Sequence, residues 1–350
     1  VEPVIFFNDI RRTDEQKGVF GEVSYALSDT AELTLGARWY DIAVDFEGSA
    51  NSSFGNGFGN PDEQRFGSNL SVQYAPGNAN GYPDKAETDG VIGKATVSWN
   101  PDDDIMYYVT WSEGFRPGLL NRPVGSSNAD GSYVVKPEVD TDEITNYEFG
   151  WKTISKDGQL RFNGSAFYVD VTGLQSTIFD PSIVNLFFSD NAADATIKGV
   201  EGDFTYYTNV DGLSVAGAFS FLDTEITEKL VPTDDVIVGE ELAFAPGMQG
   251  NIRVRQEWGM AAGNVGHLQL QLTYSDDSYS DIMEPNKARQ ASYSYIDLRA
   301  GITNDDLSAE LYVDNVTDER AEISNTFVFD RQRVAYIRPT TIGIRVKRNF

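Results

Sequence analysis

The chain ends on the stretch Thr340-Thr341-Ile342-Gly343-Ile344-Arg345-Val346-Lys347-Arg348-Asn349-Phe350. Its apolar side chains fall on one side of a two-residue period, at Ile342, Ile344, Val346 and Phe350. Small, cationic and amide side chains occupy the other side. Because successive side chains of a β-strand point to opposite faces, this alternation predicts a strand with one apolar and one polar face.

A terminal strand of this kind fits two sorts of β-protein. A soluble β-sandwich strand would alternate in a similar way, but a strand that stops on an aromatic residue is typical of outer-membrane barrels. In a barrel the last strand closes the sheet on an earlier one, because lipid offers no partner to unpaired backbone groups. We therefore expect an all-β fold, an antiparallel transmembrane β-barrel whose hairpins lead to this closing strand.

The two-residue period recurs along the chain. The clearest alternating segments lie at residues 19–27, 33–39, 105–112, 147–152, 268–274, 296–302 and 307–313. No segment has a convincing helical period, and the pattern predicts about fourteen strands. Near Gly164 the alternation changes phase, which predicts a bulge or a close approach of two backbones.

Short and long connections alternate between these segments. Short turns are expected at residues 28–30, 100–104, 156–158, 209–212, 259–264 and 304–306. Longer polar connections are expected at residues 47–87, 116–139, 179–194, 228–245, 276–290 and 316–337. A membrane barrel has this asymmetry, with tight turns at the periplasmic rim and long loops outside. A sandwich or a propeller gives no reason for strict alternation.

Composition excludes several classes of function. The 350 residues contain no Cys and one His, and they carry a net charge of −27. Cysteine chemistry, histidine metal clusters and nucleic-acid binding are therefore not expected. Asp and Asn side chains gather at residues 180–194 without EF-hand spacing, so we expect no metal site and no cofactor. We also expect no enzyme, because the sequence has no nucleophile elbow and no phosphate loop.

Five phrases of the sequence carry a family resemblance. They are Trp111-Ser112-Glu113-Gly114-Phe115-Arg116-Pro117-Gly118, Lys136-Pro137-Glu138 with Asn146-Tyr147-Glu148-Phe149-Gly150-Trp151-Lys152, Ile197-Lys198-Gly199-Val200-Glu201, Tyr312-Val313-Asp314-Asn315-Val316-Thr317-Asp318-Glu319, and Arg338-Pro339-Thr340-Thr341-Ile342-Gly343. In this order they resemble phrases of the TonB-dependent outer-membrane receptors. Residues 1–110 match that family by pattern more than by motif.

The resemblance implies a receptor of the Gram-negative outer membrane that takes up a scarce ligand, with an iron–siderophore complex as the expected cargo. Such receptors have a plug domain, a TonB box and a barrel of about 22 strands. No part of residues 1–350 looks like a plug. We therefore expect residues 1–350 to form one partial barrel domain, with the plug and the remaining strands supplied by sequence outside this chain.

The resemblance also implies partners. These are outer-membrane lipid and lipopolysaccharide, the TonB energy-coupling complex acting through the absent plug, the barrel assembly machinery acting at Phe350, and a small-molecule or metal-complex cargo. A passive porin or a structural, adhesive barrel is the alternative function, because neither needs a plug. A soluble all-β enzyme or propeller is a third interpretation, which the alternating connections disfavour.

Two sets of residues are candidates for function. Arg116, Asn121 and Arg122 begin a long connection, where they could bind an anionic ligand through paired guanidinium donors. The alternative is a loop-base arginine that packs on aromatic rings or bonds backbone carbonyls. The polar sides of the predicted strands carry Arg38, Glu148, Glu201, Arg253, Arg255, Arg299 and Arg345. We expect these side chains to face the lumen and the plug, or to pair with one another across strands.

Overall fold

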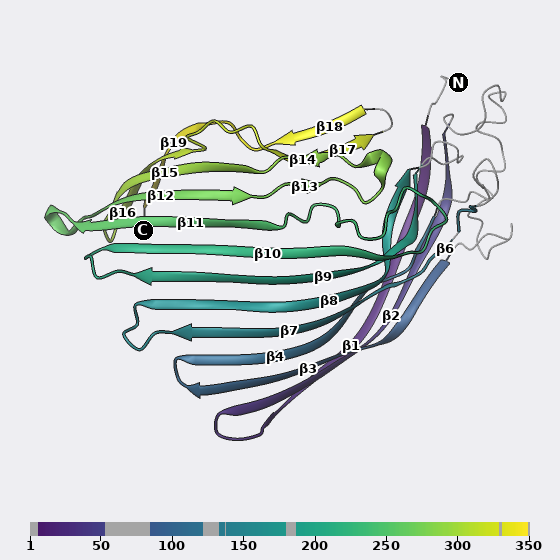
Figure 1. The fold of residues 1–350 in the computed structure, drawn as a ribbon, viewed down its shortest axis with the longest axis horizontal. Coiled ribbons are helices and arrows are strands. Elements are labelled where there is room, and N and C mark those ends of the chain that lie inside the picture. The colour runs from purple at the N-terminus through teal and green to yellow at the C-terminus, as the bar shows by residue number, and fades with distance from the viewer. Residues whose placement is uncertain are drawn as a thin grey trace.

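A computed structural model describes residues 6–52, 85–121, 133–136, 138–179, 187–328 and 331–348. One antiparallel sheet of thirteen strands dominates it (Figure 1). In chain order its strands are β1 (Phe6–Ala26), β2 (Ala31–Ser52), β3 (Lys85–Asp102), β4 (Ile105–Arg116), β7 (Asp142–Ile154), β8 (Leu160–Phe179), β9 (Phe187–Tyr207), β10 (Leu213–Lys229), β11 (Met248–Gly259), β12 (Val265–Ser275), β15 (Tyr293–Thr303), β16 (Leu307–Asp314) and β19 (Thr341–Arg348). The prediction of an all-β, antiparallel fold is confirmed.

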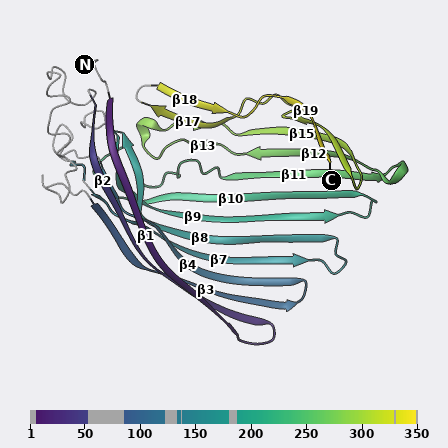
Figure 2. The same cartoon turned by 180° about the vertical axis from the view of Figure 1, so that it is seen from behind.

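Figures 1 and 2 show the short turns at one end of the sheet and the long connections at the other. The predicted alternation of short and long connections is therefore confirmed. Three boundaries were wrong, because residues expected in connections belong to strands. Residues 47–52 end β2, residues 85–87 begin β3, and residues 187–194 begin β9. There β9 pairs with the end of β8 beyond an irregularity between Val171 and Gln175, which displaces the two-residue period.

Small elements occupy the long connections. Three two-stranded hairpins form there, from β5 (Leu119–Leu120) and β6 (Glu138–Val139), β13 (Ser278–Tyr279) and β14 (Arg289–Gln290), and β17 (Glu322–Val328) and β18 (Arg331–Tyr336). Two single-turn 3₁₀ helices, η2 (Ala261–Gly263) and η3 (Glu284–Asn286), complete the described elements. None of the helices in these ranges is long and apolar enough to cross a membrane.

The strand register assigns every side chain of the sheet to one of two faces, because directly opposed residues point to the same face. Glu148 opposes Phe167, and Phe167 opposes Gly199. Followed across the sheet, the register places these candidates on a single face: Arg38, Glu148, Glu201, Arg253, Arg255, Arg299 and Arg345. We call this the polar face and the opposite one the apolar face.

The apolar face leaves large aliphatic side chains uncovered. Val19 is 69% exposed, Val109 57% and Ile344 74%, and they come from the first, fourth and last strands of the sheet. A soluble domain rarely exposes so continuous an apolar surface. An outward apolar band is what a sheet presents to the hydrocarbon core of a bilayer.

Aromatic rings cover glycines of the neighbouring strand. The ring of Phe167 occupies the space beside Gly199, where an added Cβ would lie 2.5 Å from Phe167 Cζ. Trp151 covers Gly164 in the same way, and the Gly164 position also lies 2.6 Å from the backbone oxygen of Glu201. The phase change predicted near Gly164 therefore marks a close approach, because the ladder continues unbroken through it.

Candidate functional site

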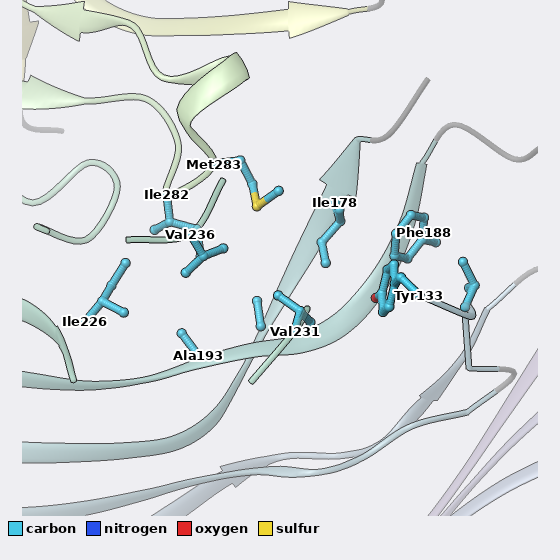
Figure 3. Close-up of a cluster of buried hydrophobic side chains, with 11 residues drawn as sticks. Tyr133, Ile178, Phe188, Ala193, Ile226, Val231, Val236, Ile282 and Met283 are labelled. Atoms are coloured by element: carbon cyan, nitrogen blue, oxygen red, sulfur yellow. The ribbon is translucent and has the colours of Figure 1, made fainter. Parts of the chain in front are cut away.

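A buried hydrophobic cluster lies where the long connections fold over the sheet (Figure 3). We call it the loop-end cluster. It consists of Tyr133, Val135, Ile178, Phe188, Ala192, Ala193, Ile226, Val231, Val236, Ile282 and Met283. Ile226 is fully buried and belongs to the polar face of β10, so the connections cross that face. Burial of each such aliphatic side chain stabilises the packing by about 1.5–3 kcal/mol.

Backbone hydrogen bonds join the connections that contribute to the loop-end cluster. In the β10–β11 connection, the Leu242 N–H donates to the Thr224 hydroxyl of β10 at 3.0 Å. The Glu284 N–H of the β12–β15 connection donates to the Asp235 carbonyl at 2.9 Å. These bonds tie two connections to each other and to the sheet, so the long-connection end is a built surface and not a set of separate loops.

Arg116 is the last residue of β4, and it pairs with Asp142, the first residue of β7. The Arg116 Nε donates to Asp142 Oδ2 at 2.6 Å, and the Arg116 backbone N–H donates to Oδ1 at 2.9 Å. Its Nη2 also donates to the carbonyl oxygen of Gln175 in β8 at 3.1 Å. Asp142 is completely buried. The guanidinium therefore joins β4, β7 and β8. Its bond to the Gln175 carbonyl fits the alternative interpretation, that of a loop-base arginine bonded to backbone carbonyls. A ligand contact through Arg116 stays a prediction.

Asn121 holds part of the connection between β4 and β7. Its side-chain amide donates to the carbonyls of Lys136 and Ser189, and its Oδ1 accepts the Ser189 N–H at 2.8 Å. Because an amide has two N–H donors, these bonds use both of them. The residue is 6% exposed, so its bonds join the β4–β7 connection to β9, and its role as a ligand contact stays untested. Arg122 lies outside the described residues.

Two residues that join distant segments were not identified as such from the sequence, Asn191 and Asp190. Asn191 accepts the Asp140 N–H and donates to the carbonyls of Asp140 and Gly173, while Asp190 accepts a hydrogen bond from the Tyr133 hydroxyl. Both residues are buried. Their run of Asp and Asn looks like loop chemistry, because these side chains commonly bond local backbone in turns. Here they bond segments distant in sequence, which the run alone does not reveal.

The polar face carries a charge cluster near the short-turn end. Its centre is Glu310, whose Oε2 lies 3.2 Å from His267 Nε2. The Glu310 Oε1 lies 3.6 Å from Arg299 Nη1 and 3.5 Å from Arg345 Nη1. Arg299 also donates to Asp314 Oδ1 at 2.9 Å. Arg299 and Arg345 therefore pair across strands, which is one of the two roles that the sequence analysis considers for these charges.

The other candidates on the polar face differ in their contacts. Glu148 accepts the Tyr108 hydroxyl at 2.5 Å, and Arg255 bonds Glu257 and the Gln269 side chain. Three further candidates form no ion pair within 4 Å with any residue that the structure describes: Arg38, Glu201 and Arg253. Whether any of these side chains contacts a plug stays a prediction.

A large antiparallel sheet with one apolar face, short turns at one end and long folded connections at the other defines a β-barrel protein of the outer membrane. A family model described as "TonB dependent receptor-like, beta-barrel" matches residues 3–316. The chain belongs to this family. Its members are transport receptors of the Gram-negative outer membrane, which is where this chain resides.

Solved structures share this fold at low sequence identity. The ferric yersiniabactin uptake receptor FyuA from Yersinia pestis is 18% identical with a TM-score of 0.72, over 97% of this chain and 46% of that one. The pyoverdine outer membrane receptor FpvA from Pseudomonas aeruginosa PAO1, bound to pyoverdine, is 17% identical with a TM-score of 0.64, over 97% and 43%. The copper transporter OprC is 14% identical with a TM-score of 0.70, over 97% and 49%.

The chain spans less than half the length of each of these structures. A comparison with curated protein sequences finds no significant match. At these identities the likeness concerns the fold, and the three proteins are named for different cargoes, which are ferric yersiniabactin, pyoverdine and copper.

Proposed function

We propose that this chain is the C-terminal part of the barrel of a receptor that takes up a scarce ligand across the outer membrane in a TonB-dependent manner. An iron–siderophore complex is the proposed cargo. Membership of the receptor family supports the transport class, and the siderophore receptors among its structural relatives favour this cargo. Because a copper transporter is also among these structures, a cargo other than an iron–siderophore complex is the alternative.

The loop-end cluster is the observation that carries the proposal. Three long connections pack together across the polar face instead of leaving it open. A receptor needs such an ordered surface to hold its ligand, because rigid positioning lowers the entropic cost of binding. A passive porin has no need to cover its lumen with packed connections.

The domain organisation belongs to the same proposal. Residues 1–350 would form one partial barrel domain, and a plug with further strands would come from sequence outside it, in line with the length of the structural relatives. The plug would contact the polar face, where Arg38, Glu201 and Arg253 offer charges for ion pairs. TonB would act through that plug, with outer-membrane lipid, lipopolysaccharide and the assembly machinery as further partners. The assembly contact falls on Phe350, outside the described residues.

Two measurements test the proposal. The native protein is extracted from membranes in detergent, and its intact mass is expected to exceed 38.7 kDa, with peptides that map upstream of Val1. Cells that lack the gene are then supplied with a panel of radiolabelled iron–siderophore complexes, and they are expected to lose energy-dependent uptake of one of them. Uptake that persists without TonB, or ion conductance through an open pore, would support the passive porin instead.

A further inference from the structure

A pocket of about 340 Å³ opens beside the loop-end cluster. It is lined by residues 174–177 of β8, by Leu242 and Ala243, and by residues 280–282. The wall from β8 and the two walls from the β10–β11 and β12–β15 connections therefore meet in one hollow. Its volume lies at the lower end of the range for small-molecule sites, about 300–1,000 Å³, which suits one side group of a larger ligand or a small ligand by itself.

The walls of this pocket are fixed in place. Gln175 donates its side-chain amide to the carbonyls of Pro117 and Asp140, and its own carbonyl accepts Arg116 Nη2. On the opposite wall, Phe244 adopts a φ of 55°, a left-handed conformation that is strained for a bulky residue. Its N–H donates to the Tyr279 carbonyl at 2.7 Å, which holds the two connections together at this strained point.

The lining combines four aliphatic residues with four uncharged polar residues and a single acid, Asp281. Its Oδ1 accepts the Met283 N–H at 3.0 Å, and no cationic side chain of the described residues lies within ion-pair distance of its carboxylate. Two nearby cations are already engaged. Lys287 bonds Glu240 at 2.6 Å and Glu284 at 3.0 Å, and Arg116 is held by Asp142.

We propose that this pocket binds a protonated amine attached to a small apolar body. Leu174, Leu242 and Ile282 would cover the apolar body. The Asp281 carboxylate would receive the ammonium group in a charge-assisted hydrogen bond. An anionic group is disfavoured in the same place, because it would lie beside a partly buried carboxylate without a balancing cation. Its role in uptake rests on the proposed function, whereas the pocket chemistry does not.

The ionisation of Asp281 is consistent with such an environment. Burial raises the pKa of the Asp281 carboxyl above its ordinary value, and the backbone N–H groups of Met283 and Ile282 oppose this rise by bonding the ionised form. A desolvated carboxylate gains more from a cation than an exposed one does, because the surrounding dielectric constant is lower.

The test uses the full-length receptor, purified in detergent, with 2-phenylethylamine as the probe and 3-phenylpropionate as its anionic counterpart. We expect saturable binding of the amine by isothermal titration calorimetry and none of the acid. D281N keeps a side-chain oxygen for the Met283 N–H but removes the charge, and it is expected to weaken the amine by about tenfold. E241Q removes an equal charge from an exposed residue next to the wall, and it is expected to bind like the unaltered receptor.

A second variant locates the binding. A243F fills the pocket from the β10–β11 wall and is expected to abolish amine binding. Unchanged affinity in D281N or in A243F, or equal binding of the acid, would overturn the proposal. Amine binding and uptake by cells are independent measurements. A receptor that transports a siderophore but does not bind the amine contradicts only the pocket proposal. A receptor that binds the amine but supports no uptake contradicts only the proposed transport function.

Discussion

Arg116 pairs its half-exposed guanidinium with a buried carboxylate. A cationic residue at the start of a long connection is a reasonable candidate for an anion, and the sequence around it offers no indication of its partner. The partner, Asp142, lies at the start of the next long strand and is completely buried. Because the two residues are distant in sequence, only the β4–β7 pairing identifies the contact.

Replacement of Arg116 by alanine tests its bracing role. R116A leaves the Asp142 carboxylate buried with backbone donors alone, and an unsatisfied buried group costs about 1–3 kcal/mol. Arg116 itself is about half exposed, so solvent screening places the expected cost in the lower part of that range. Amide hydrogen exchange is expected to quicken at residues 138–142. The double variant R116A/D142N removes the stranded charge and is expected to recover most protection; unaltered exchange in R116A would contradict the bracing role.

The raised pKa of Asp281 makes a prediction about pH. A raised pKa means that the folded protein holds this proton at pH values where an ordinary carboxyl, with a pKa of 3.8, has lost it. Amine binding is therefore expected to fall as pH decreases, beginning above the range of an exposed carboxyl, while an alkylamine with a pKa of about 10 stays charged. Calorimetric titrations between about pH 8 and about pH 4 measure this loss, and the weaker binding of D281N should lack it.

At the scale of elements, aromatic–glycine pairs bind neighbouring strands together. Phe167 of β8 covers Gly199 of β9, and Tyr108 of β4 covers Gly150 of β7. A ring over a glycine packs against backbone that a side chain at that position would shield. Glycine is otherwise unfavourable in a strand, and here its cost is offset by the ring that it admits.

Substitution of Gly199 tests this packing. G199V places a branched side chain where the Phe167 ring lies, and overpacking of this kind typically costs about 1–3 kcal/mol. The folded fraction in membranes is expected to fall, as measured by heat-modifiable migration in gel electrophoresis. Gly21 of β1 provides the matched control, because an added Cβ there meets nothing within 4 Å. G21V is expected to fold normally; equal folding of both variants would show that the ring is easily displaced.

The two-residue period identified the strand class, the two faces and the alternation of connections. These features are local, because one buried or lipid-covered face fixes the pattern of its own strand. The start of β9 was missed because an irregular register at Val171 to Gln175 displaces the period, and its Asp and Asn side chains resemble turn residues. The bracing network was missed for another reason: its bonds connect segments far apart in sequence, such as Asn121 and Ser189.

For the whole molecule, the absence of cysteine from these 350 residues allows a direct test of orientation. Val238 is 53% exposed in a long connection, and Asp103 lies in a short turn. With a membrane-impermeant maleimide on intact cells, V238C is expected to be labelled and D103C to remain unlabelled. Both should react after the cells are lysed. Labelling of D103C alone on intact cells would reverse the proposed orientation.

The aromatic–glycine pairs also bear on how the sheet assembles without error. A strand that pairs two residues out of register keeps its apolar side chains toward lipid and its polar ones inward. Burial of apolar surface therefore does not disfavour this register, whereas the packing of the aromatic rings does. In such a register Phe167 would meet Ile197 or Glu201 in place of Gly199, and Tyr108 would meet Glu148 or Lys152 in place of Gly150. Each aromatic–glycine pair thus destabilises a shifted register that the lipid environment alone would tolerate.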